Sequence, residues 1–129
     1  MSDSPASRFR AAVESHDIGA GAALLAPDVV FHSPVVFRPY EGRDAVAGLL
    51  GVVAQTFEDF EYVGEVESGD EAVLRFKTRV GDRTIEGVDI IHWNADGLID
   101  QFTVMLRPLS GTMAMAHAMK ENLASAGHH

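Results

Sequence analysis

Apolar side chains three or four residues apart indicate helices in four stretches of the chain. The first helix begins after Ser4, where a serine followed by proline is typical of a helix start, and runs to about residue 16. A short second helix begins after Asp17. The clearest helix spans about residues 43–57, and an alanine- and methionine-rich helix is expected at about residues 112–124. The buried side of the clearest helix consists of Val46, Leu49, Leu50, Val53 and Phe57.

Strands are indicated where β-branched and aromatic residues gather or where apolar and polar residues alternate. The run over residues 29–36 predicts a first strand, in which Pro34 indicates an edge position or a bulge. Four further alternating stretches, joined by short turns, predict a meander. Helices grouped against one face of a curved antiparallel sheet make an α+β fold. Such a sheet, curled around a helix, leaves a pocket at its open end for a small ligand.

Asp89 stands in the middle of the most apolar strand of the chain. Burying an unpaired carboxylate is costly unless the group keeps its proton. If Gly81 and Asp82 form a two-residue hairpin loop, Leu74 lies opposite Asp89. If residues 94–97 form the next loop, Phe102 lies opposite Asp89 on its other side. We therefore expect Asp89 on the concave, apolar face of the sheet, where desolvation raises its pKa.

The same alternation places two other polar side chains relative to Asp89. Asp100 has the same parity and is expected on the same face, on a diagonal of roughly 7–8 Å. His92 has the opposite parity, so it is expected to point away from Asp89. Val88 and Ile90 also point to that other face. Because these two residues are apolar, the other face is expected to be covered by a second copy in a homodimer.

Composition limits the classes of function. The 129 residues suffice for one domain. The net charge of −9, from 19 acidic and 10 basic residues, argues against nucleic acid as a partner. The chain contains no cysteine, no long apolar stretch and no signal peptide pattern, so a cytoplasmic location without membrane contact is expected. No metal-ligand motif appears, and Gly19-Ala20-Gly21 lacks the context of a dinucleotide loop, so no metal or cofactor is expected. His128 and His129 are set aside as candidate purification-tag residues.

Several motifs point to a known group of proteins. They are LAPDVVFHSP at residues 25–34, YEGRDAV at 40–46, GVD at 87–89 and NADG at 94–97. Together with the order of elements, they resemble the nuclear transport factor 2-like superfamily, and within it the SnoaL-like and ketosteroid isomerase-like proteins. The resemblance covers about residues 5–108 of a single domain spanning 1–129. It implies a cone-shaped, curved and mostly antiparallel mixed sheet around helices, a deep apolar pocket and a homodimer.

Comparison with ketosteroid isomerase can be made residue by residue. Asp89 matches the oxyanion-hole carboxylic acid that an apolar site keeps protonated, which is an established example of a raised pKa. Ser33 stands where the isomerase has its general-base aspartate, and Phe9 where it has the oxyanion-hole tyrosine. A serine without an adjacent base abstracts a proton from carbon poorly at neutral pH. The resemblance therefore implies a retained pocket but disfavours steroid isomerisation.

The candidate catalytic residues are Asp89, Ser33 and His32, and His32 reaches the pocket only if Pro34 introduces a bulge. Asp89 has a structural alternative, in which it bonds a buried amide or arginine. His117 would reach the pocket if the last helix caps it. The candidate substrate-binding residues are Phe9, Phe31, Tyr40, Phe57, Leu74, Phe76, Trp93, Phe102 and Val104.

The sequence thus predicts a protein that binds a small apolar molecule in a pocket. The leading interpretation is an enzyme that isomerises, cyclises, dehydrates or hydrolyses a carbonyl- or hydroxyl-bearing substrate, with Asp89 as acid or hydrogen-bond donor. The alternative is a non-catalytic ligand-binding or dimerisation module. A third option resembles limonene epoxide hydrolase, which uses two aspartates with an arginine between them. The arginines near Asp89 and Asp100 have the wrong parity, so this option is weak.

Overall fold

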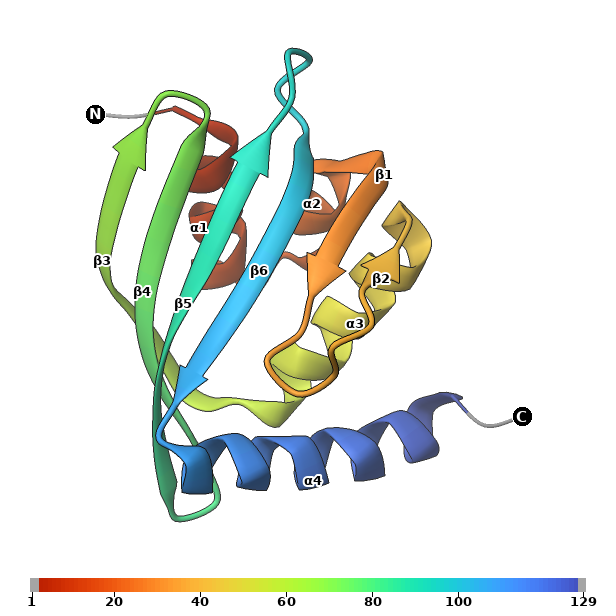
Figure 1. Ribbon diagram of the computed structural model, residues 1–129, viewed down its shortest axis with the longest axis vertical. Coiled ribbons are helices and arrows are strands. Elements are labelled where there is room, and N and C mark those ends of the chain that lie inside the picture. The colour runs from red at the N-terminus through yellow and green to blue at the C-terminus, as the bar shows by residue number, and fades with distance from the viewer. Residues whose placement is uncertain (1–2, 128–129) are drawn as a thin grey trace.

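The computed structural model describes residues 3–127, and His128 and His129 lie outside this part (Figure 1). Its elements follow one another in the order helix, helix, strand, strand, helix, four strands and a final helix. Their bounds are α1 Pro5–Glu14, α2 Ile18–Ala23, β1 Leu25–His32, β2 Tyr40–Glu41, α3 Arg43–Thr56, β3 Glu58–Ser68, β4 Glu71–Val80, β5 Arg83–Trp93, β6 Ile99–Arg107 and α4 Leu109–Gly127. The predicted α+β fold is confirmed, and the short strand β2 is an addition to the predicted elements.

The helix starts agree with their sequence signals. The Ser4 hydroxyl accepts the Ser7 amide proton at 3.1 Å and caps α1, while Asp17 caps α2 through the Ala20 amide at 3.0 Å. The helix α1 ends at Glu14 rather than residue 16, because the backbone of His16 adopts a left-handed conformation with φ of 58°. The final helix begins three residues earlier than predicted.

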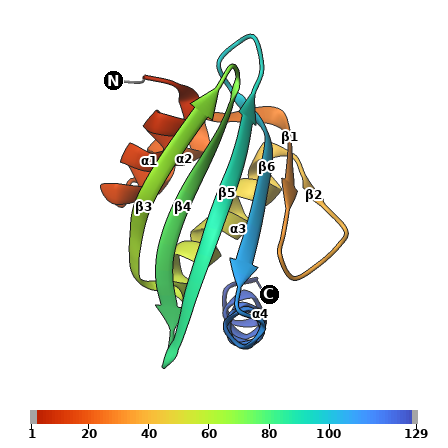
Figure 2. The same ribbon diagram turned by 60° about the vertical axis from the view of Figure 1, so that its left-hand side comes forward.

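The sheet has six strands in the order β2-β1-β6-β5-β4-β3. The pair β1–β6 is parallel and the other pairs are antiparallel, so the predicted mixed, mostly antiparallel sheet is confirmed. Figures 1 and 2 show the sheet strongly twisted, with α1, α2 and α3 on one face and α4 across the end where β6 finishes. Within residues 3–127, every helix is too short or too polar to cross a lipid bilayer.

The hairpin between β4 and β5 has the predicted register. Val80 pairs with Arg83 across the Gly81-Asp82 loop, and Leu74 lies opposite Asp89. Gly81 adopts a φ of 61°, which a tight two-residue turn requires and glycine allows without strain. The short loop therefore fixes which residues of β5 face the helices.

The register between β5 and β6 differs from the prediction. Asp89 pairs with Val104 instead of Phe102, and the pairing shifts between His92 and Trp93. This irregularity moves Asp100 out of the predicted diagonal with Asp89. The Asp100 carboxylate contacts His92 Nδ1 at 2.6 Å instead. A bulge near a hairpin loop leaves little trace in an alternating pattern, so simple parity could not place Asp100.

The first strand also differs from its prediction. It begins at Leu25 and ends at His32, four residues earlier at each end than expected. Pro34 therefore follows the strand, in the loop that leads to β2, and neither marks its edge nor forms a bulge in it. Just before this proline, the Ser33 hydroxyl accepts the Val35 amide proton at 3.0 Å. This local turn competes with further strand pairing and ends β1.

Candidate functional site

A cavity of about 830 Å³ lies between the helices and the concave face of the sheet. Its walls come from α1, α2, α3, α4 and strands β3 to β6, together with the end of β1. Most of the interior lining is aromatic or aliphatic, including Phe9, Phe31, Phe60, Phe76 and Phe102. A deep apolar cavity with a few polar groups is the usual form of a small-molecule site.

The polar group at the inner wall of this cavity is Asp89. Its side chain comes from β5, near the centre of the sheet, and the residue is only 6% exposed. Its cross-strand neighbours are Leu74 and Val104, neither of which offers a counter-charge. Burial raises the pKa of Asp89 to about 7, while a hydrogen bond from Tyr62 acts in the lowering direction. The carboxyl group is thus balanced between its acid and its anion near neutral pH.

Tyr62 is the partner of Asp89. Its hydroxyl donates to Asp89 Oδ2 at 3.1 Å, and both residues line the cavity. Burial, followed by the negative charge of Asp89, raises the pKa of Tyr62 well above its usual value, so the phenol keeps its proton. Among the described residues, Asp89 Oδ1 has no hydrogen-bond partner. Oδ1 is therefore the oxygen left to meet a ligand.

The Tyr62 ring is held by contacts from α1 and β3. The guanidinium carbon of Arg10 lies 5.5 Å from the ring centroid, and Arg10 also pairs with Glu14 at 3.1 Å and Glu65 at 3.2 Å. Phe60 meets the ring edge-on at a centroid distance of 4.9 Å. A cation over the ring face and a perpendicular aromatic neighbour are favourable arrangements. They fix the direction in which the hydroxyl points.

The chain matches one protein family. The sequence profile of the SnoaL-like domain matches residues 6–102 of the chain. The chain belongs to the SnoaL-like family. No curated protein is significantly similar to this SnoaL-like chain in sequence.

Solved structures agree with this assignment. The SnoaL-like chain is similar to a steroid delta-isomerase from Pseudomonas aeruginosa, with a TM-score of 0.90, 38% identity and coverage of 94% of this chain and 90% of that one. It is also similar to an uncharacterized cystatin-like protein from Silicibacter pomeroyi DSS-3, with a TM-score of 0.90, 35% identity and coverage of 95% and 86%. An NTF2-like protein from Mesorhizobium loti has a TM-score of 0.72 at 23% identity, covering 81% and 88%, and shares the fold. The predicted superfamily is confirmed.

Most of the sequence-predicted site residues surround this cavity. Those that line it are Asp89, Ser33, Phe9, Phe31, Phe57, Phe76, Phe102 and Val104. The final helix contributes Met115 and Met119, so it does close one end of the cavity. His117 of that helix points to solvent and lies 3.7 Å from Glu121. The roles of these residues in binding or catalysis stay predictions.

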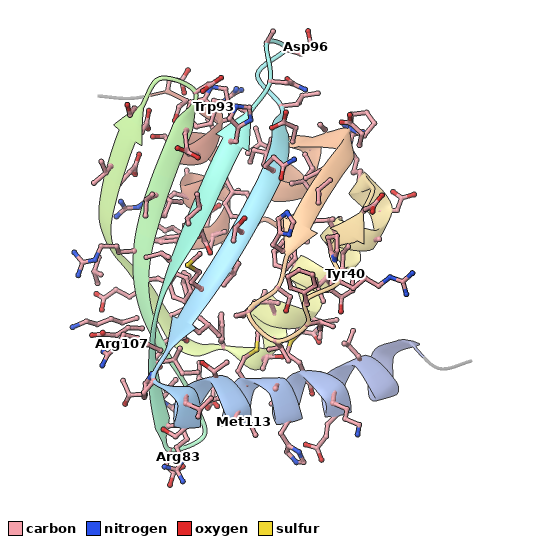
Figure 3. All side chains as sticks on the ribbon, viewed as in Figure 1. Tyr40, Arg83, Trp93, Asp96, Arg107 and Met113 are labelled. Atoms are coloured by element: carbon pink, nitrogen blue, oxygen red, sulfur yellow. The ribbon has the colours of Figure 1, made fainter. Side chains whose placement is uncertain are left out.

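Four of the predicted residues do not line the cavity. Leu74 is fully buried in the core beside Asp89. His32 follows the inward-facing Phe31 and points to the opposite side of β1. Tyr40 lies on the edge strand β2, where its ring packs on the ring of Phe31 at 6.3 Å. Trp93 lies beyond the register shift, near the loop that joins β5 to β6 (Figure 3).

Tyr62 is a site residue that sequence reasoning does not identify. Tyr62 follows Phe60 by two positions in β3, a spacing that places both side chains on one face, and Tyr62 is buried. The signal that could have identified it is its hydroxyl, because a buried tyrosine needs a hydrogen-bond partner. The strand pairing that aligns Tyr62 with Phe76 includes register shifts, so its distance from Asp89 cannot be inferred from parity.

Proposed function

We propose that this SnoaL-like protein is a cofactor-independent enzyme that acts on a small apolar carbonyl- or hydroxyl-bearing molecule. The observation that carries the proposal is the Asp89 carboxyl group, buried in an apolar cavity, bonded through Oδ2 to Tyr62 and open at Oδ1. In its protonated form Asp89 donates a hydrogen bond from Oδ1 to the substrate oxygen. A donor placed where negative charge develops stabilises the transition state of enolisation, cyclisation or loss of hydroxyl.

Asp89 and Tyr62 have different roles, because only Asp89 changes its charge. The Tyr62 phenol stays protonated, and its hydroxyl donates a hydrogen bond to Asp89 whether Asp89 is protonated or ionised. The bond steadies the Asp89 anion after Asp89 has passed its proton to the substrate oxygen. A group whose pKa is about 7 gives and retakes a proton at similar free energy near neutral pH. Asp89 is therefore suited to return to its acid form after each turnover.

Binding of a simple ketone tests the donor role. The probe is 2-acetylnaphthalene, an apolar ketone that accepts a hydrogen bond but cannot donate one. We expect its affinity to fall by about tenfold per pH unit above the Asp89 pKa, since only the acid form donates. The Asp89→Asn variant keeps a donor that does not titrate, so its affinity stays level with pH. A level profile in the unsubstituted protein would contradict the donor role.

One observation favours the alternative to an enzyme, a non-catalytic ligand-binding module. The Ser33 hydroxyl accepts the Val35 amide proton in a turn, and among the described residues no base is bonded to it. Hydrogen–deuterium exchange at the acetyl methyl group separates the two functions. For an enzyme, Asp89 protonates the ketone oxygen while solvent water takes a methyl proton, and the enol regains a deuteron from solvent on return to the ketone. Exchange is then about tenfold or more faster with the unsubstituted protein than with Asp89→Asn. Equal exchange rates together with tight ketone binding would establish the module instead.

We propose in addition that two copies pair through the outer face of the sheet. No helix of residues 3–127 covers this face in Figures 1 and 2. It presents apolar side chains from adjacent strands, among them the partly exposed Val63, Val66 and Met105. Val88 pairs with Met105 at its centre. An exposed apolar patch that spans several strands is typical of a protein–protein interface.

A further inference from the structure

The mouth of the cavity is acidic. Some side chains line the cavity and are also exposed to solvent, so they form its entrance. Among them are three carboxylates and one imidazole. They come from the junction of α1 with α2 and from the beginning of β3. These residues are Glu14, His16, Asp17 and Asp59.

The arginines near the mouth do not neutralise it. Arg10 pairs with Glu14 but also with Glu65, and its charge is shared between them. Arg79 is shared in the same way by two carboxylates, Asp59 at 2.6 Å and Glu58 at 2.9 Å. The mouth and its ion pairs thus hold five carboxylates against two guanidinium groups.

One of the mouth carboxylates has no ion pair among the described residues: Asp17 accepts the Ala20 amide proton as the cap of α2. Several cations lie on the far side of the sheet. Arg75, Lys77 and Arg107 surround a shallow hollow on the outer face, where Arg107 pairs with Glu86 at 2.6 Å. The sheet therefore separates these cations from the cavity mouth.

We infer that the ligand of this cavity is an apolar carbonyl compound that carries a protonated amine at its solvent-facing end. The inference rests on the proposed function, because Asp89 is taken to hold the carbonyl oxygen at the inner end. The apolar walls accept the body of such a ligand, while the carboxylates of the mouth attract its ammonium group. A cleft lined by one sign of charge, with low-dielectric walls, concentrates ions of opposite charge. Ligands that end in a carboxylate or phosphate are disfavoured.

Three matched probes test the inference. Each is 2-acetylnaphthalene with a butyl chain on the distant ring, ending in a primary amine, a hydroxyl group or a carboxylate. Affinity is measured by titration calorimetry at about pH 6 and low salt. We expect the amine to bind about tenfold or more tightly than the carboxylate, with the alcohol between them. Raising the salt concentration should narrow this difference, because the mouth charges are exposed and screened.

Charge-neutral variants locate the effect at the mouth. Asp17→Asn together with Glu14→Gln removes two mouth charges, and asparagine preserves the cap of α2. We expect this variant to lose most of the preference for the amine. The matched control is Asp96→Asn with Glu71→Gln, which changes the net charge equally but away from the cavity. Asp96 lies at the tip of the loop between β5 and β6 (Figure 3). The control should keep the preference.

The outcomes separate this inference from the proposed function. If amine and carboxylate bind equally while the simple ketone keeps its pH-dependent affinity, the inference is overturned and the proposed function stands. The inference is also overturned if the control loses as much preference as the mouth variant. If the charge preference holds but ketone affinity is level with pH, the mouth selects cations and the donor role of Asp89 fails.

Discussion

Replacing Asp89 with asparagine is expected to change how stability depends on pH. Between pH 5 and pH 8, the free energy of unfolding of the variant rises by about 3 kcal/mol relative to that of the unsubstituted protein. The native pKa of Asp89 is about 7, whereas an aspartate in an unfolded chain titrates at about 4. Between these values the folded state keeps a proton that the unfolded state has released. The contribution of Asp89 to stability is therefore full below about pH 4 and lost as pH rises through 7.

Urea unfolding of both proteins across this pH range measures the effect. Asparagine has nearly the same shape as aspartate and still accepts the Tyr62 hydrogen bond, but it does not titrate in this range. Groups that titrate in both proteins cancel when the two free energies of unfolding are subtracted. Asp96→Asn, at an exposed loop position, serves as the control and should show no pH-dependent difference. Parallel curves for Asp89→Asn would show that Asp89 has an ordinary pKa.

Changing Met105 to glutamate is expected to convert a dimer into a monomer. Met105 is 56% exposed on the outer face of β6, so a charged side chain there leaves the isolated subunit intact. In a symmetric pair the new charge meets an apolar surface or its own copy, and either is unfavourable. Analytical ultracentrifugation gives the mass in solution.

The matched control for this change is Met113→Glu. Met113 is 63% exposed on α4, away from the outer face of the sheet (Figure 3). We expect this variant to keep the mass of the dimer. A monomeric unsubstituted protein would contradict pairing of any kind. A Met105→Glu variant that remains dimeric would place the interface elsewhere on the subunit.

The sequence predicted the central part of the site because its hairpin is short. A two-residue loop at Gly81 and Asp82 leaves one register for β4 and β5, and this register fixed the direction of Asp89. The loop between β5 and β6 is longer and is followed by an irregular pairing. The position of Asp100 and the exclusion of Trp93 from the cavity depend on that irregularity. Neither could be predicted from alternation.

The comparison between Phe9 and Tyr62 shows a second limit of sequence reasoning. The resemblance to ketosteroid isomerase places Phe9 where a catalytic tyrosine is expected, which implies that Asp89 has lost its phenolic partner. The structure supplies a phenol from another element, since Tyr62 of β3 bonds Asp89 directly. Phe9 packs edge-on against Phe102 at 5.1 Å and completes the apolar wall. A hydrogen bond can thus keep its chemistry while its donor comes from a different element of the fold.

The proposed chemistry depends most on the pKa of Asp89. This pKa can be measured from the side-chain carbonyl chemical shift of the protein labelled with ¹³C at aspartate, assigned with Asp89→Asn. We expect a midpoint at a pH of about 7 and a higher midpoint in Tyr62→Phe, because the Tyr62 hydrogen bond lowers this pKa. A midpoint at about 4, the usual value of an exposed aspartate, would contradict a proton-donating Asp89.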